Sequence, residues 1–115
     1  MPHPTNSSDY LNKIVSVIMD RSLGTKHPKH GFVYEVNYGY IPNTVSGDGE
    51  EIDAYVLDID KPLKEFTGRC VAIIHRTNDN YDKLVVVPDG LQITNQFIEQ
   101  KTNFQEQWFK HKIIR

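Results

Sequence analysis

The pattern of apolar and polar residues predicts five strands in the first three quarters of the chain. Short runs of β-branched and aromatic residues are separated by segments rich in Gly, Pro and Asn, which is typical of strands and turns. Within one run, Ile52, Ala54 and Val56 alternate with Tyr55 and Leu57, so both faces of that strand are expected to be used. The last two runs flank a short turn and predict a hairpin. The predicted strands are 13–20, 32–42, 52–59, 70–76 and 83–88.

The period of the pattern changes after Asp89 and Gly90. Thr94 can cap a helix, because its hydroxyl can accept a hydrogen bond from a free backbone N–H of the first turn. We therefore expect one or two helices at the end of the chain. The residues at helical spacing are Phe97, Ile98, Lys101, Phe104, Trp108 and Phe109.

Five short strands followed by a helical tail predict a mainly β (α+β) fold. The expected architecture is a small, closed or nearly closed five-stranded barrel with the C-terminal helix or helices packed on it. The length of 115 residues is that of one domain. Residues 1–12 are polar and rich in Pro and Ser, so we expect a flexible N-terminal segment followed by a single domain over 13–115.

Composition and charge narrow the function classes. The net charge of -2 does not favour binding to nucleic acid or to an anionic membrane. No apolar run approaches the roughly 20 residues of a membrane helix, and the N-terminus has no signal pattern. The single cysteine, Cys70, lies in an apolar run and is expected to be a buried thiol in a reducing compartment. Together these features predict a cytoplasmic protein.

Three acidic residues carry the first chemical signal. Asp48 and Glu50 flank Gly49 in a turn, and Asp53 opens the following strand. A turn that enters a strand can bring the three carboxylates together, and such a cluster needs a positive counterpart. Mg²⁺ prefers oxygen ligands and keeps waters for substrate phosphates, so a magnesium site is one interpretation. A solvated acidic turn is the other.

Cationic and phenolic side chains carry the second signal. A metal site that faces several cations suits phosphoryl transfer, where catalysis depends on positioning and charge neutralisation. Tyrosines within one predicted strand, such as Tyr34 and Tyr38, can pack a ring and still donate to a phosphate. Solvated surface cations and core tyrosines are the alternative interpretation. The candidate substrate-binding cations are Lys26, His27, Lys29, His30, Arg76, Lys83 and Lys110.

Two motifs together resemble a known family. The run "NYGYIPNTVSGDGEEIDAYVL" resembles the core of the family I soluble inorganic pyrophosphatases, and "DKLVVVP" resembles a later strand of that family. The tail "FQEQWFK" is similar to a helix of the family that ends in Tyr-Lys. The resemblance implies an OB-like barrel and Mg²⁺-dependent hydrolysis of inorganic pyrophosphate to two phosphates by a metal-activated water, with Mn²⁺ as a substitute metal.

The resemblance also implies roles for individual residues. Glu50 would help to activate the attacking water, while Tyr38 and Lys83 would act on the phosphates. Lys110 matches the lysine of the helical Tyr-Lys pair, and Lys26 is a counterpart of an early substrate-binding lysine. The implied metal ligands are Asp48, Glu50, Asp53, Asp79 and Asp82.

The chain departs from the family pattern at several positions. It is much shorter than a usual member, and Glu50 stands where the family has an aspartate. Tyr81 occupies a position that is usually acidic, and Phe109 stands where a tyrosine hydroxyl is expected. The loop "HPKH" at 27–30, with its histidines and lysine, is a candidate replacement for a missing phosphate-binding arginine.

Two other functions stay open from the sequence alone. The trimmed chain could admit a nucleotide or another phosphoanhydride, or the protein could be a non-catalytic, OB-like module that binds phosphate or nucleic acid. The weak negative charge and the acidic cluster argue against nucleic acid. The aromatic tail suggests burial against a partner subunit, so a homo-oligomer is a further expectation.

Overall fold

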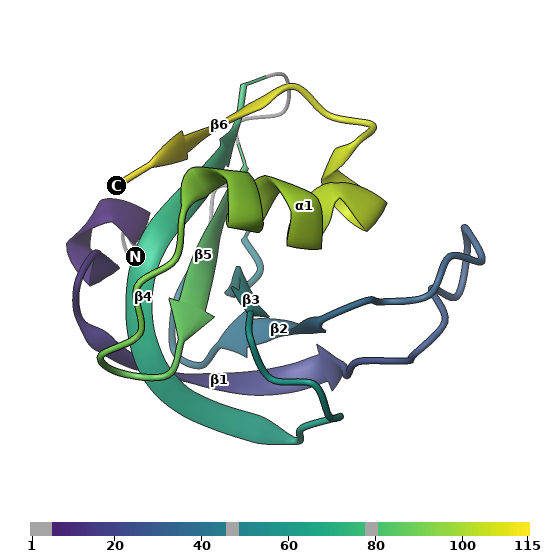
Figure 1. Ribbon diagram of the computed structural model, residues 1–115, viewed down its shortest axis with the longest axis horizontal. Helices are drawn as coiled ribbons and strands as arrows, with labels where there is room; N and C mark the ends of the chain where they lie inside the picture. The colour runs from purple at the N-terminus through teal and green to yellow at the C-terminus, as the bar shows by residue number, and fades with distance from the viewer. Residues whose placement is uncertain (1–5, 46–48, 78–80) are drawn as a thin grey trace.

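Strand pairing closes a five-stranded barrel in the computed structural model, which describes residues 6–45, 49–77 and 81–115 (Figure 1). The barrel runs in the order β1-β2-β3-β5-β4, and β4 pairs back with β1. Only the β3–β5 pairing of this ring is parallel. The strands are β1 (Ile14–Arg21), β2 (Asn37–Ile41), β3 (Ile52–Val56), β4 (Glu65–Arg76) and β5 (Asp82–Val87).

All five strands expected from the sequence are present, with different bounds. β2 begins at Asn37 because residues 32–36 form no continuous ladder; only Val33 makes an isolated bridge, to Lys26. β4 begins at Glu65, earlier than expected, because its first half pairs with β1 and its second half with β5. Gly68 allows β4 to lie this close to β5, since a Cβ at that position would be 2.4 Å from the carbonyl oxygen of Val87.

The two faces of the strands bury two separate apolar clusters. Ile52, Ala54 and Val56 point into the barrel, whereas Tyr55 and Leu57 pack on its outer face, as the alternation predicted. Cys70 is fully buried in the barrel interior. The inner cluster comprises Val15, Val17, Ile41, Ile52, Ala54, Val56, Cys70, Ile73, Leu84 and Val86.

Helix α1 (Asn95–Glu106) covers the outer face of the barrel (Figure 1). Thr94 caps it as expected, because its side chain accepts from the N–H of Phe97. Ile98 and Phe104 insert into the outer apolar cluster beside Tyr55 and Leu57. No helix in the described part of the chain is long and apolar enough to cross a membrane.

The chain beyond Glu106 corrects the prediction of a longer helical tail. Trp108, Phe109 and Lys110 lie beyond the helix, in the turn and short connection before the last strand, because α1 ends at Glu106. The last element is a strand, β6 (His111–Ile114), which pairs with β4 from Ile73 to Arg76. The β-branched residues Ile113 and Ile114 favour a strand over a helix here, since they pack against opposite faces of the sheet.

A short 3-10 helix, η1 (Ser7–Tyr10), lies within the segment expected to be flexible. Its Ser7 is buried and donates to the Asp82 carboxylate. Just after it, the backbone N–H of Asn12 donates to the carbonyl oxygen of Cys70 on β4 (2.7 Å). These contacts attach the start of the described chain to the barrel.

Asn37, at the start of the "NYGYI" motif, joins three segments of the chain. Its side chain is fully buried and accepts from the N–H groups of Leu23 and Leu63, both at 3.0 Å. Its amide donates to the carbonyl oxygen of Lys61 at 2.9 Å. The asparagine therefore stabilises the loops that follow β1 and β3.

Replacing Asn37 by alanine is expected to destabilise the fold. Asn37→Ala removes three buried hydrogen bonds, each worth about 1 kcal/mol, so the free energy of unfolding should fall by about 3 kcal/mol. Urea denaturation measures the change. Asn103→Ala, at an exposed position of α1, is the matched control and should stay within about 0.5 kcal/mol of the unchanged protein. Equal stability of the two variants would contradict the role assigned to Asn37.

Candidate active site

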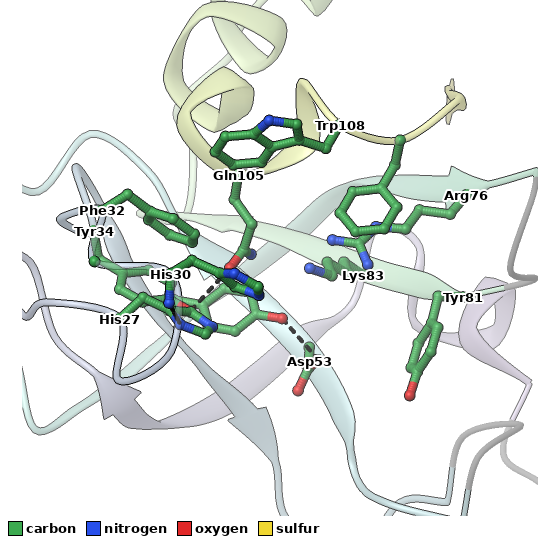
Figure 2. A pocket seen from close by; sticks show the side chains of 13 residues that line it. His27, His30, Phe32, Tyr34, Asp53, Arg76, Tyr81, Lys83, Gln105 and Trp108 are labelled. Carbon is green, nitrogen blue, oxygen red and sulfur yellow. Dashed lines mark hydrogen bonds between the residues drawn. The ribbon is translucent and has the colours of Figure 1, made fainter.

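A cavity of about 920 Å³ lies beside the C-terminal end of α1, between this end and the loop 27–32 (Figure 2). Strands β2, β3, β4 and β5 each contribute a residue from their outer face. Its walls are mostly aromatic, with a few charged groups among them. The lining residues are His27, His30, Gly31, Phe32, Tyr34, Tyr38, Asp53, Arg76, Tyr81, Lys83, Gln105, Trp108 and Phe109.

A buried carboxylate lies behind the two cations of the cavity. Glu106 is 1% exposed and does not line the cavity itself. Its Oε1 accepts from Arg76 Nε at 2.9 Å, and its Oε2 accepts from Arg76 Nη2 at 2.8 Å and from Lys83 Nζ at 3.1 Å. Tyr55 Oη adds a further hydrogen bond to Oε2 at 2.6 Å. Glu106 thus fixes the positions of both cations through hydrogen bonds with strong charge assistance.

Burial and the charged partners together set the protonation of Glu106, Lys83 and Arg76. Burial alone would raise the pKa of Glu106, but the bonds from Arg76 and the charge of Lys83 lower it to about 2. Burial lowers the pKa of Lys83 to about 8, although Glu106 opposes this shift. The pKa of Arg76 is raised, because its bonds to Glu106 outweigh desolvation, which would lower it. At neutral pH the cluster therefore holds two cations and one carboxylate.

Asp53 lies next to this cluster and is held by a tyrosine. Tyr38 Oη donates to Asp53 Oδ2 at 2.7 Å. Burial, and then the charge of Asp53, raise the pKa of Tyr38 well above its usual value, so the phenol acts as a donor. In the parallel pairing of β3 with β5, Asp53 lies opposite Lys83, which brings a carboxylate and an ammonium group to the same face of the sheet.

Gln105 connects the tyrosines of the site. Its Oε1 accepts from Tyr34 Oη at 2.9 Å, and its amide donates to Tyr55 Oη at 2.7 Å. Tyr55 in turn donates to Glu106, so a series of hydrogen bonds joins β3 and α1 to Tyr34, three residues before β2. These hydrogen bonds fix the orientation of the Tyr34 and Tyr55 rings.

Seven of the residues proposed from the sequence line this one cavity: His27, His30, Tyr34, Tyr38, Asp53, Arg76 and Lys83. Four others are exposed and are not among its lining residues: Lys26, Lys29, Glu50 and Lys110. The backbone N–H of Lys29 donates to His27 Nδ1, and the carbonyl oxygen of Lys110 accepts from the N–H of Thr77. Their backbones thus shape the surroundings of the site.

Of the proposed metal ligands, Asp53 lines the cavity and Asp82 does not. Asp82 shares the inward face of β5 with Leu84 and Val86, where its carboxylate pairs with His75 and accepts from Ser7. Asp48 and Asp79 lie outside the described residues. Among the residues that are described, no three metal-binding side chains form a cluster.

Sequence reasoning missed Glu106 and the role of Phe109. Glu106 follows Ile98 and Thr102 at helical spacing, so its place on the buried face of α1 was a usable signal. The ring of Phe109 lies 3.6 Å from the guanidinium carbon of Arg76, a cation–π contact. The residue that lacks the expected tyrosine hydroxyl therefore packs on a cation of the site instead.

Comparisons with known proteins agree on one family. The family model for inorganic pyrophosphatase matches residues 10–113. An inorganic pyrophosphatase of Xylella fastidiosa is 35% identical over 80 residues, which are 64% of this chain and 40% of the relative. One of Pseudomonas aeruginosa is 29% identical over 92 residues, 76% of this chain and 50% of the relative. The chain thus spans half or less of the length of these curated relatives.

Solved structures show the same fold. The inorganic pyrophosphatase of Ehrlichia chaffeensis superposes with a TM-score of 0.68 at 19% identity, covering 97% of this chain and 88% of that one. The corresponding protein of Coxiella burnetii gives a TM-score of 0.63 at 18% identity, covering 90% and 84%. At this identity the likeness establishes the architecture, an OB-like barrel with a C-terminal helix.

Removing the charge of Glu106 is expected to destabilise the protein strongly. Glu106→Gln leaves Arg76 and Lys83 buried without their counter-ion, so the free energy of unfolding should fall by about 3–5 kcal/mol in urea denaturation. The control is Glu99→Gln, the same change at an exposed position of the same helix, which pairs with His111 and should cost less than about 1 kcal/mol.

Two further measurements separate the ion pair from simple packing. Lys83→Met combined with Glu106→Gln should cost less than the sum of the single changes, because it removes a cation together with its partner. Since the pKa of Glu106 is lowered from 4.5 to about 2 by folding, its contribution is present above pH 4.5 and is lost as the pH falls toward 2. Additive losses in the free energy of unfolding would contradict this account. So would a Glu106→Gln variant whose stability falls between pH 4.5 and 2 as much as that of the unchanged protein.

Proposed function

This chain belongs to the inorganic pyrophosphatase family, and on that premise we propose that it hydrolyses inorganic pyrophosphate to two phosphates with Mg²⁺. The observation that carries the proposal is the convergence of Asp53, Lys83, Arg76 and Tyr38 on one cavity. This set combines a carboxylate, two cations and a phenolic donor, which are the groups that phosphoryl transfer uses for positioning and charge neutralisation.

The residues of the acidic turn fit a hard divalent cation in the type of their donors. Asp53 presents a carboxylate to the cavity, and Glu50 precedes it by three residues. Carboxylate oxygens are the protein ligands that Mg²⁺ prefers. We propose Asp48, Glu50, Asp53 and Asp79 as the holders of the metal, with Mn²⁺ as a substitute. Held there, the cation would supply charge neutralisation and activation of water.

The other residues of the site have separable roles in this proposal. Arg76 and Lys83 bind phosphate oxygens, and Glu106 keeps both side chains in place behind the cavity wall. Tyr38 donates to Asp53 and holds that carboxylate in one orientation. Phe109 covers the guanidinium group of Arg76 and limits its contact with bulk water. Preorganised charges of this kind stabilise the charge that develops on the phosphates.

The proposed reaction is a single displacement. A water oxygen forms a bond to one phosphorus, the bridging P–O bond breaks, and the second phosphate leaves. Glu50 is the proposed acceptor of the proton from that water. A cytoplasmic location and a homo-oligomeric state belong to the same proposal and stay predictions.

Loss of the Asp53 charge should abolish most of the activity. Asp53→Asn keeps the size and an acceptor for Tyr38 but removes the negative charge, so kcat/KM for pyrophosphate should fall about 100-fold or more. Phosphate release in the presence of Mg²⁺ measures this, and a chelator should stop the reaction until Mg²⁺ is added again. Asp60→Asn, at an exposed acid after the same strand, is the control that should retain activity. Turnover that survives chelation would refute the proposal.

Two neighbouring glutamates allow a test of the proton acceptor. Glu50→Gln should lower kcat about 100-fold, because an amide cannot accept the proton from water. Glu51→Gln makes the same change one position later, at another exposed side chain, and should leave kcat within about twofold. Similar kcat values in both variants would remove Glu50 from the mechanism.

A further inference from the structure

The cavity is larger and more aromatic than a ligand made only of phosphates requires. A water molecule occupies roughly 30 Å³ in the liquid. If each non-hydrogen atom of pyrophosphate took that much space, the whole molecule would fill about 270 Å³. The cavity measures about 920 Å³. Several rings line the cavity, and we name five of them the aromatic wall: His27, His30, Phe32, Tyr34 and Trp108.

The aromatic wall is a connected set of rings. Phe32 lies at its centre, with ring centroids 4.8 Å from His27, 5.4 Å from Tyr34 and 5.6 Å from Trp108. The planes of His30 and Phe32 are parallel to within 1° at 6.3 Å. Rings fixed by one another in this way lose little freedom when a further flat ring stacks on them.

The outer members of the wall are open to a ligand. Trp108 is 60% exposed, more than the other exposed large apolar side chains in the described chain, although it lines the cavity. The ring of His27 is held by the N–H groups of Lys29 and His30, both 3.1 Å from Nδ1. Desolvation, followed by the neighbouring His30 and Arg21, lowers the pKa of His27, so a neutral ring is present at pH 7.

The cations lie on the other side of the same cavity. Figure 2 shows His27, His30, Phe32 and Tyr34 gathered on one side and Arg76 and Lys83 on the other. A short series of contacts joins the two sides. Lys83 Nζ lies 4.9 Å from the ring of Tyr38, whose centroid is 5.5 Å from that of Tyr34.

We propose that this cavity takes nucleoside 5′-diphosphates, with the phosphoanhydride at Arg76 and Lys83 and the base stacked on Trp108 and His30. The substrate claim rests on the proposed function. Water would attack the terminal phosphorus, the bridging P–O bond would break, and a nucleoside monophosphate, inorganic phosphate and one proton would be released. Stacking of bases on aromatic side chains tolerates different bases, so little preference among them is expected.

Charge favours this ligand over a second copy of the chain. A copy that buried the aromatic wall would also have to cover Arg76, Lys83 and Asp53, which line the same cavity. An anionic ligand gives the two cations further oxygen acceptors, whereas a covering surface of apolar side chains does not. A ligand with both a phosphoanhydride and a flat ring satisfies both sides of the cavity at once.

Trp108 is the single tryptophan of the chain, so its fluorescence reports on the wall directly. The ligands are α,β-methylene-ADP and methylenediphosphonate, which resist hydrolysis, and adenosine, all titrated with Mg²⁺. The first should quench the fluorescence saturably and bind about tenfold more tightly than either of the others in calorimetry. Equal affinities of α,β-methylene-ADP and methylenediphosphonate would overturn the proposal.

Variants of the wall provide the second test. Trp108→Ala and His30→Ala should each weaken α,β-methylene-ADP about tenfold and methylenediphosphonate much less, with folding checked by circular dichroism. Val33→Ala, an exposed apolar residue beside Phe32 that does not line the cavity, is the control and should bind like the unchanged protein. A similar loss for both ligands would also overturn the proposal.

Activity separates this proposal from the proposed function. Release of AMP and phosphate from ADP, together with pyrophosphate hydrolysis, would support both. Pyrophosphate hydrolysis without ADP hydrolysis would overturn the nucleotide as substrate and leave the proposed function standing. Ring-dependent binding without any hydrolysis would refute the proposed function and support the base-binding wall. Dimerisation in sedimentation that blocks α,β-methylene-ADP would identify a second copy as the occupant.

Discussion

The buried carboxylate of Glu106 is the constraint on which the arrangement of the site depends. One side chain at the end of α1 accepts from Arg76 on β4, Lys83 on β5 and Tyr55 on β3. The helix is thereby fixed to three strands of the barrel at the point where the cavity begins. Because a buried ion pair is expensive to break, a shift of α1 would expose uncompensated charge. The position of the cations and the position of the helix are therefore set together.

Strand alternation decides which charged residues can meet. Lys83 shares the outer face of β5 with Val85 and Val87, and the parallel register brings it opposite Asp53. Asp82, one residue earlier, points inward and pairs with His75. Neighbours in the sequence thus have different roles: Lys83 lines the cavity, whereas Asp82 contacts His75 of β4 and Ser7 of η1.

The sequence predicted the barrel well and the site in part. Local alternation and turn residues carry enough information for five strands, and the apolar pattern assigned Ile52 and Tyr55 to opposite faces. The tail was predicted less well, because the pairing of β6 with β4 is a non-local contact that the helical spacing of Trp108 and Phe109 concealed. Glu106 was missed for a similar reason: its partners come from strands distant in the sequence.

The roles of the aromatic residues depend on the same non-local contacts. A tyrosine-to-phenylalanine difference at Phe109 reads in the sequence as the loss of a hydroxyl, yet in the fold the ring covers Arg76. Likewise, Trp108 and Phe32 are distant along the chain but their rings are 5.6 Å apart. The strands supply the charges, whose positions alternation fixes, whereas the segment 27–34 and the turn after α1 supply the rings of the aromatic wall. Because loops vary more freely than strands, a barrel of this kind can keep its charged groups while its loops change which ligand they accept.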